Sequence, residues 1–537
     1  MTNRTLPMTN IESLQAIARQ RLIEYPNTAT YTALFLGFCW LLSLWFSNPK
    51  LRATVPDAQV HGFRSWWEPT LLLQIRFVWS AVDIIKSGYK KFQDAPFVVR
   101  RYDADITIMP FKYLEEMRAI PRSKLNCKMP QIHNLVPKWT WAEFMYDSDL
   151  IVRVLNGQLN RNLPKYVDIA RSELEYAWDI EIPQTDEWAE VDIQQIFRRL
   201  VSRMSAKVFM GYPACRDQDW INLSIGFTHD MFVAAFTLRM FPPWTHRYIA
   251  PLVPARRRMW NQIKTAERIV GNLVKKRDDA RNRGDEVEDT LLGWMMDNGN
   301  ETETRLGEMA FRQCFLTLAS IHTTSVSVST VLFDLCDHPE WFPVLREEIE
   351  QVTAQYGPIG EHPGMTSRQW IAKLMKMDSF IIEMQRTNPQ ILLRPQRVAM
   401  VPLTLKDGTT IPQGARVAWA GHHHANDPSI LTSDPEAFDP MRSYRKRTAY
   451  VDEDGENPNK YTAVDQSDMD TLAFGYGGQA CPGRYFAIGE IKLVLSRMLV
   501  QFDFAYPKGK SRPKRMYADE NTFIDAHATL MMRKRKV

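Results

Sequence analysis

The pattern of hydrophobic and polar positions contains two long apolar stretches. Residues 29–46 carry no acidic or basic side chain. Gly307 to Asp337 contain no proline, and their only glycine is the first residue. About thirty helix-compatible residues predict a helix of about 45 Å, long enough to cross a whole domain. Hydroxyls and one imidazole occupy its centre, residues 320–325, which costs free energy unless partners, water or a ligand satisfy them.

A third pattern is the alternation of apolar and polar residues from Leu403 to Ala418. Asp407-Gly408 offers a hairpin turn between two short strands, and Gly414 offers a second bend. Helical periodicity dominates elsewhere. The chain is therefore predicted to be mainly α with small β sheets, an α+β class, with one long central helix.

The first apolar stretch has the length of a membrane-spanning helix, since a bilayer core is about 30 Å thick. A cleaved signal peptide would have a shorter apolar region closed by small residues, and neither feature is present. The prediction is a lead at residues 1–28, a transmembrane anchor at 29–46, a linker at 47–65 and one large domain at 66–537. Lysines and arginines are balanced on the two sides of the anchor, so the charges leave its orientation open.

Composition narrows the possible classes of protein. The net charge of +5, from 67 Lys and Arg against 62 Asp and Glu, is far below that of a nucleic-acid-binding domain. The six cysteines form no CxxC pair, so neither a zinc site nor a disulfide framework is indicated. The 16 Trp and 25 Met suit a large hydrophobic interior.

One cysteine has a distinctive setting. Cys481 follows a glycine-rich loop that begins at Phe474, and an apolar-periodic helix follows it. Backbone N–H groups at a helix N-terminus are predicted to lower the pKa of this thiol and to hydrogen-bond its sulfur. The glycines would let the backbone approach a flat ligand closely. For the other cysteines, inert packing is the simpler interpretation.

This loop resembles the haem-binding loop of the cytochrome P450 superfamily, the haem-thiolate monooxygenases. The resemblance rests on Phe474, Gly477, Cys481 and Gly483. It implies a single P450-like haem domain that binds haem b, iron protoporphyrin IX, with Cys481 as the axial ligand of the iron. The other three residues would then bind the cofactor. Dioxygen would be the co-substrate.

A second motif agrees with the resemblance. Glu383 and Arg386 have the i, i+3 spacing that places two side chains on one helix face. Alone, such a pair is most often a surface salt bridge. In the family this Glu and Arg join a later arginine in a buried triad that braces the haem loop, and Arg442 matches that arginine.

The central helix also matches the family's oxygen-binding patch. Thr323 aligns with the hydroxyl beside bound dioxygen, and Ala319 and Ser320 leave room for it. The sequence departs from the family at the preceding acid, which is His322. An imidazole could relay protons in place of the acid, or it could be a structural histidine that faces away.

The haem propionates lack two of their usual partners. Gln479 stands where the family often has a basic residue, and no Trp-x-x-x-Arg occurs between residues 139 and 165. Arg397 matches a position that commonly contacts a propionate, and Arg161 is a second, weaker candidate.

Short segments resemble filamentous-fungal microsomal members of secondary metabolism, among them Gly88 to Phe92, His338-Pro339-Glu340 and Asn388-Pro389-Gln390. A histidine in the oxygen patch resembles enzymes of diterpene, meroterpenoid and indole-terpenoid pathways. The resemblance implies oxidation of a hydrophobic metabolite of this kind, by an enzyme in the endoplasmic reticulum membrane whose catalytic domain is cytosolic.

Electrons would come from NADPH through a separate cytochrome reductase, because the chain has no room for a fused flavin domain; cytochrome b5 is a second candidate donor. Basic residues that could face an acidic partner are Arg445, Lys446, Arg447 and Lys492. Two alternatives stay open: a haem-thiolate enzyme that desaturates or rearranges a skeleton, and a haem-binding sensor without turnover.

Overall fold

A computed structural model describes residues 53–431, 434–449, 463–467, 469 and 471–536, together with Tyr31, Leu34 and Gly37, which are helical. The predicted lead, the rest of the anchor and the first part of the linker lie outside these residues. Part of the predicted linker is folded, because β1, Gln59–Val60, pairs with β2, Phe97–Arg100.

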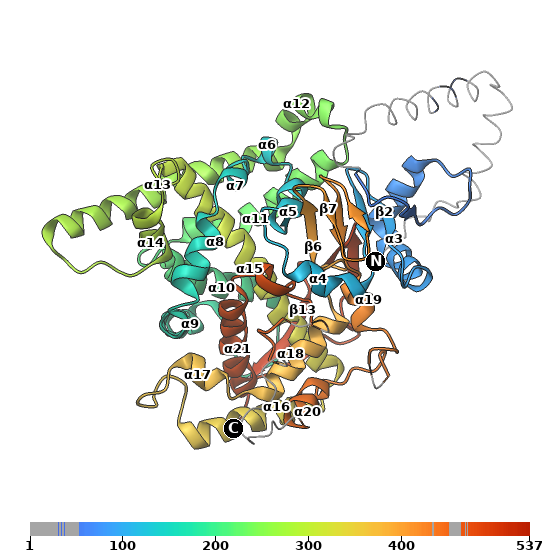
Figure 1. Cartoon of the computed structure of the whole chain (residues 1–537). Helices are drawn as coiled ribbons and strands as arrows, with labels where there is room; N and C mark the ends of the chain where they lie inside the picture. Colours follow the sequence, from blue (N-terminus) through green and yellow to red (C-terminus); the bar gives the residue numbers. More distant parts are fainter. Residues whose placement is uncertain are drawn as a thin grey trace, which may run out of the picture.

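The predicted central helix is α15, Leu306–Asp337. Most of its residues are buried, since other long helices surround it (Figure 1). The helices that pack on it are α10 Ile193–Phe209, α11 Gln218–Arg239, α13 Pro254–Arg283, α18 Met375–Thr387 and α21 Arg484–Gln501. Apolar residues at helical spacing explain this arrangement, because each helix turns its apolar face toward the common core.

Further helices extend this core. Those of eight or more residues are α3 Thr70–Lys91, α9 Leu163–Glu181, α14 Leu291–Asn298, α16 Trp341–Tyr356 and α20 Arg442–Ala449. Shorter helices include α4 Leu114–Arg118, α5 Lys128–Asn134, α12 His246–Ile249 and α19 Gly421–Ala425.

Two described helices, α11 and α15, are long and apolar enough to cross a membrane by length and composition. Both are core helices here, because more than half of the most apolar stretch of each helix is buried inside the protein. Their apolar character is explained by packing.

The β structure is small, as predicted. Figure 1 shows the largest sheet to one side of the helices, next to α3. Its six strands run in the order β1-β2-β3-β9-β6-β4. Besides β1 and β2 they are β3 Asp105–Ile108, β9 Arg416–Ala418, β6 Gln396–Ala399 and β4 Leu125–Asn126.

Three further small sheets complete the β structure of the described residues. The first contains β10 Phe502–Ala505, β13 Thr529–Lys534 and β5 Ala189–Asp192. The second pairs β11 Arg515–Ala518 with β12 Asn521–Ile524, and the third pairs β7 Leu403–Thr404 with β8 Thr410–Ile411. The last pair is the predicted hairpin, and Gly408 in its turn has a φ of 90°. The mainly α class with small sheets is confirmed.

Candidate active site

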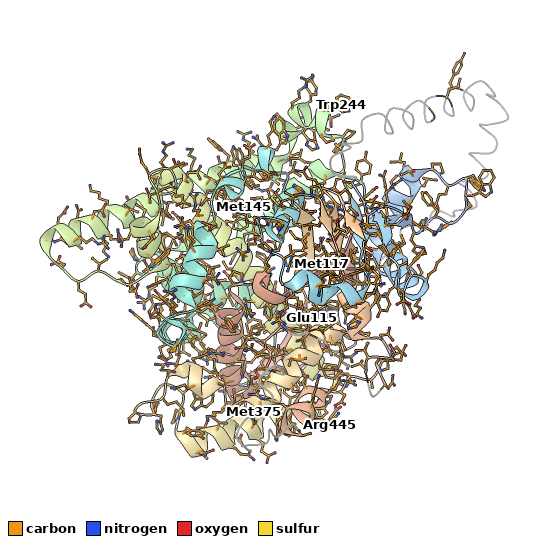
Figure 2. All side chains as sticks on the ribbon, in the orientation of Figure 1. Glu115, Met117, Met145, Trp244, Met375 and Arg445 are labelled. Carbon is orange, nitrogen blue, oxygen red and sulfur yellow. The ribbon has the colours of Figure 1, made fainter. Side chains whose placement is uncertain are left out.

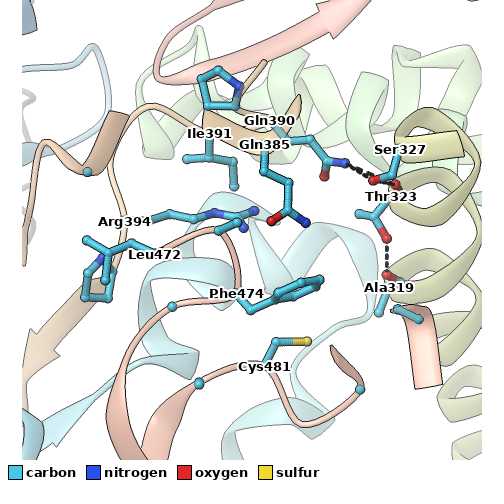
Figure 3. A pocket seen from close by; sticks show the side chains of 18 of the residues that line it. Ala319, Thr323, Ser327, Gln385, Gln390, Ile391, Arg394, Leu472, Phe474 and Cys481 are labelled. Carbon is cyan, nitrogen blue, oxygen red and sulfur yellow. Dashed lines mark hydrogen bonds between the residues drawn. The ribbon is translucent and has the colours of Figure 1, made fainter. Parts of the chain in front are cut away.

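A cavity of about 1150 Å³ lies between α15 and the loop that precedes α21. Figure 3 shows Cys481 and Phe474 on that loop, and Ala319 and Thr323 on α15, facing the same space. The loop between α18 and β6, residues 388–395, forms another wall. The structure therefore brings the cysteine loop and the hydroxyl patch of the central helix together at one cavity.

The cysteine loop is held by its own backbone. Gly475 and Gly477 have φ values of 81° and 68°, a region that favours glycine, and the Cys481 N–H donates to the Phe474 carbonyl at 2.7 Å. A Cβ on Gly477 would lie 2.5 Å from the side chain of Arg118 on α4. Packing and backbone conformation both require glycine at that position.

The space around Gly483 is more open than that around Gly477. A Cβ built there would meet no protein atom within 4 Å, and its φ of −86° is open to any residue. Protein packing does not demand glycine at this position. The open space beside it and the thiol that faces the cavity fit the flat group that the family binds.

The thiol itself corrects one prediction. Cys481 lies just before α21, which begins at Arg484 with Gly483 as its N-cap. Cys481 is exposed to the cavity, but desolvation by the surrounding protein raises the pKa of its thiol above its ordinary value, although the backbone N–H groups of Gly483 and Arg484 and the charge of Arg394 act in the opposite direction. Loop amides alone therefore do not produce the thiolate that the sequence led us to expect.

Glu383 and Arg386 form a buried bidentate pair on α18, with Arg386 Nη2 and Nε 2.6 and 2.8 Å from the two carboxylate oxygens. Arg442 Nε lies 3.5 Å from Glu383 Oε2. Arg386 also donates to the carbonyls of Pro435 and Ala437, at 2.7 and 3.0 Å. The three predicted residues are thus together, and they tie α18 to the segment that leads into α20.

Thr323 and His322 face in different directions. The Thr323 hydroxyl is open to the cavity and donates to the Ala319 carbonyl at 2.9 Å. His322 Nε2 lies 3.0 Å from the Ile225 carbonyl on α11. Burial lowers the pKa of His322 to about 4, so the ring is neutral near pH 7 and Nε2–H is the donor.

The sequence did not indicate a role for Gln390. Its Nε2 donates to the Thr323 carbonyl at 3.0 Å and to Ser327 Oγ at 3.1 Å (Figure 3). Ser327 Oγ donates to the same carbonyl at 2.8 Å. Its signals in the sequence were its place a few residues after the Glu383 and Arg386 pair and its membership of the segment Asn388-Pro389-Gln390, which resembles fungal members of the family.

Arg397 lines the cavity and donates to the carbonyls of Tyr476 and Gln396, both at 3.0 Å. Arg122 and Lys128 line the cavity as well and were not predicted. Arg161 is exposed and does not line it, because it lies in the turn before α9. Arg397, Arg122 and Lys128 are thus three of the cationic residues that line this cavity, which Arg394 lines as well.

Gln479 has a structural task. Its amide donates to the carbonyls of Ile120 and Leu125, and its oxygen accepts from the backbone N–H of Cys127. It therefore joins the cysteine loop to the segment around β4, and Cys127 lies at the cavity wall.

The prediction that Lys492 faces an acidic partner is wrong. Lys492 is buried, and its Nζ lies 2.7 Å from Asp378 and 3.0 Å from the Leu374 carbonyl. Arg447 is mostly buried beside the same carboxylate. Arg445 is at the surface of α20, where it pairs with Asp439 (Figure 2). The basic face is therefore smaller than the sequence suggested.

Comparison with known proteins agrees with this geometry. Residues 150–525 match the cytochrome P450 family profile. Cytochrome P450 monooxygenase ATR4 of Stachybotrys chlorohalonatus is 45% identical over 96% of this chain and 97% of its own length. Ent-kaurene oxidase P450-4 of Gibberella fujikuroi is 36% identical over 95% of this chain and 99% of its own.

The fold of a solved structure is also similar. Retinoic-acid-bound cyanobacterial CYP120A1 superposes with a TM-score of 0.62 over 90% of this chain and all of that one, at 17% identity. The cysteine loop, the central helix and these similarities together place the chain in the cytochrome P450 family, as an oxygen-incorporating oxidoreductase that uses haem, dioxygen and reductase-delivered electrons.

Proposed function

We propose that the protein is a membrane-anchored haem-thiolate monooxygenase that hydroxylates or otherwise oxidises a terpenoid, meroterpenoid or indole-terpenoid intermediate of a fungal biosynthetic pathway. The observation that carries the proposal is the Cys481 thiol facing Thr323 and Ala319 across a largely apolar cavity. Relatives named ent-kaurene oxidase support the terpenoid class.

Haem b would be held by the Cys481 sulfur, by Phe474 and the glycine backbone of the loop, and by Arg397 at a propionate. Arg122 and Lys128 are further cations for the propionates. When bound, the haem supplies reductive activation of dioxygen, and its cysteine ligand favours O–O cleavage. The overall change converts R–H, O₂, two electrons and two protons into R–OH and water.

The chain's own residues position the reactants. The small side chains Ala319 and Ser320 leave space beside α15, and the Thr323 hydroxyl holds a proton at the cavity surface. His322 keeps its Nε2 proton on the Ile225 carbonyl. We therefore assign His322 a positioning role, and a proton relay through its other ring nitrogen is the alternative.

Electrons are proposed to come from NADPH through a separate reductase, with cytochrome b5 as a second candidate donor. Arg445 and Lys446 on α20 would face such an acidic partner. Residues 29–46 would anchor the chain in the endoplasmic reticulum membrane with the catalytic domain in the cytosol, where the reductase is found. Desaturation or skeletal rearrangement is a second candidate chemistry, favoured by the replacement of the usual acid by His322.

The test is expression in microsomes with a reductase, feeding of fungal terpenoid intermediates, and ¹⁸O₂ as the oxygen source. We expect NADPH-dependent products that carry one labelled oxygen. Labelled oxygen absent from every product would contradict hydroxylation and favour desaturation or rearrangement.

Cys481→Ala tests the ligand assignment. The variant should lose the spectrum of a thiolate-ligated haem in the reduced carbon-monoxide complex, because no other cysteine of the described residues lies in this loop. Cys127→Ala, at the same cavity wall, is the matched control and should keep that spectrum. Retention of the spectrum by Cys481→Ala would refute the assignment.

A further inference from the structure

A second pocket lies at the protein surface, where α13 begins. Its volume is about 460 Å³, and none of its lining residues lines the cavity that contains Cys481. Pockets of this size accept small organic molecules. We call it the tryptophan pocket, and its lining residues are Trp141, Ala250, Pro251, Arg256, Arg257 and Trp260.

Two guanidinium groups line the tryptophan pocket, and no acidic side chain does. Arg256 Nε donates to the Trp139 carbonyl at 2.8 Å, and its two Nη atoms meet no acceptor among the described residues. Burial lowers the pKa of Arg256, and no neighbouring carboxylate opposes this shift. Arg258, by contrast, pairs with Asp230 at 2.6 Å. Arg256 is half-buried and Arg257 is exposed, so a ligand can reach both from solvent.

Two indole rings form the other walls of the pocket. The ring centroids of Trp141 and Trp260 lie 5.3 Å apart, with 37° between the ring planes. The Arg256 guanidinium carbon lies 4.3 Å from the Trp141 ring centroid, a cation–π contact that holds the charge at the wall. Trp260 is 44% exposed, although Lys264, which is paired with Glu267, also lies over its ring. A flat ligand can therefore stack on the exposed part of Trp260.

The backbone around Trp141 is unusual. Val136 and Trp141 have φ values of 52° and 60°, a left-handed region that β-branched and bulky residues rarely adopt. Between them lies the short helix α6, Pro137–Thr140, which contains Trp139. Strain of this kind persists only where the surroundings enforce it, and it is common at ligand sites. The strained turn places the Trp141 ring and the Trp139 carbonyl, the two groups that hold Arg256.

The lining selects among classes of ligand. Two guanidinium groups that lack an acidic partner in the described residues would repel a cation. A neutral flat molecule would leave these groups without an acceptor, and a small inorganic anion would leave the indole rings uncovered. The two Nη atoms of Arg256 lie in one plane, which suits the two oxygens of a carboxylate. The remaining match is a flat aromatic molecule that carries a carboxylate.

We propose that the tryptophan pocket is a second ligand site, which binds an aromatic carboxylate through Arg256 and Arg257 and stacks its ring on Trp260. The inference does not depend on the proposed substrate class. Trp141 lies three residues before Phe144, which lines the catalytic cavity. A carboxylate in the tryptophan pocket thus contacts the same short segment that forms part of the catalytic wall.

The test uses the full-length haem-loaded protein, with the azole clotrimazole bound to the haem iron so that the catalytic cavity is filled. Equilibrium dialysis at pH 7 then measures the binding of 2-naphthoate, of neutral 2-naphthol and of acetate. We expect 2-naphthoate to bind about tenfold more tightly than 2-naphthol, the difference that one charge-assisted hydrogen bond makes. Acetate, which has no ring, should bind more weakly than 2-naphthoate.

Substitutions locate the binding. Arg256→Gln should weaken 2-naphthoate about tenfold and leave 2-naphthol unchanged, Arg257→Gln should weaken 2-naphthoate several-fold, and Trp260→Leu should weaken both ligands. Arg247→Gln is the matched control, because Arg247 lies over the Tyr248 ring at 4.5 Å but does not line the pocket. If Arg256→Gln does not fold, Arg257→Gln still decides.

Equal affinity for 2-naphthoate and 2-naphthol, or unchanged binding of 2-naphthoate in Arg257→Gln, would overturn the inference. Tighter binding of a soluble phospholipid, dihexanoyl phosphatidic acid, would also overturn it, because the site would then select a lipid headgroup. Failure of the proposed function would look different, since it would appear in the thiolate spectrum or in NADPH-dependent oxidation, and neither is measured by dialysis.

Discussion

At the scale of single residues, two neighbours on α15 have separate tasks. Successive residues of a helix point about 100° apart, so the side chains of Thr323 and His322 make different contacts although both residues line the cavity. Thr323 is open to the cavity, and His322 reaches across to α11. The departure from the family at residue 322 therefore changes a contact between helices.

Thr323→Ala removes the hydroxyl but keeps a small side chain. We expect haem to remain bound, product formation per NADPH to fall several-fold, and hydrogen peroxide to rise, because a proton-holding group is lost. The peroxide-to-NADPH ratio is the measurement. Thr330→Ala, one further hydroxyl of α15 at the cavity, is the control, and unchanged coupling in Thr323→Ala would contradict its assigned role.

His322 links stability to pH. Its pKa is lowered to about 4, below the 6.5 of the unfolded chain, so its contribution to stability is complete above pH 6.5 and is lost as the pH falls toward 4. At pH 5 the loss amounts to about 2 kcal/mol. His322→Gln keeps a donor for the Ile225 carbonyl but does not titrate.

The measurement is urea-induced unfolding at pH 7 and pH 5 for both proteins. Wild type should lose more stability between these pH values than His322→Gln. Other buried histidines, such as His422 and His423, titrate equally in both proteins and cancel. Identical losses would show that His322 is not held neutral.

At the scale of elements, the turn of α15 that we propose to bind oxygen is held from two sides. His322 joins it to α11, and Gln390 joins its Thr323 carbonyl to the loop at residues 388–395. Phe232 of α11 and Ile391 of that loop both line the cavity. A substrate that packs on Phe232 and Ile391 would therefore contact α11 and the loop at residues 388–395, which hold the proposed oxygen-binding turn.

Gln390→Leu tests the second support. The loss of its hydrogen bonds to Thr323 and Ser327 should increase peroxide formation and lower kcat several-fold, with a smaller change in KM, because the turn is less well positioned. Gln390→Asn, which keeps the amide on a shorter chain, should be intermediate. A change in KM alone would mean that Gln390 only shapes the substrate pocket.

At the scale of the whole molecule, a helical body and a sheet region border the cavity that contains Cys481. Aromatic residues such as Trp66, Trp67 and Trp244 are exposed (Figure 2 shows Trp244 at the periphery). The proposed anchor precedes this body, and α20 presents Arg445 at the surface. The proposed anchor and the proposed partner surface on α20 therefore lie in different parts of the chain.

Removal of residues 1–46 tests the anchor. The shortened protein should move from the membrane fraction to the supernatant after a high-salt wash, while its reduced carbon-monoxide spectrum stays that of the full chain. The continuously described part of the fold begins at residue 53. Full retention in the membrane pellet would contradict a single anchor, and loss of the spectrum would show that the segment supports the haem domain.

The sequence by itself determined the long helix, the short hairpin and the place of Cys481 in a glycine-rich loop before a helix, because periodicity, turn residues and a loop motif are local properties. It also indicated the pairing of Glu383 with Arg386, whose spacing fixes a common helix face. Their junction with Arg442 was implied only by resemblance.

Only the tertiary structure decided the remaining features, since they depend on residues distant in the chain. Gln390 reaches Thr323, Glu520 is pinned by Arg101, and Lys492 is buried beside Asp378. The direction of the pKa shift of Cys481 was mispredicted, because desolvation by the surrounding protein outweighs the local amides. Local sequence specifies backbone conformation, whereas desolvation and long-range contacts specify the chemistry of each side chain.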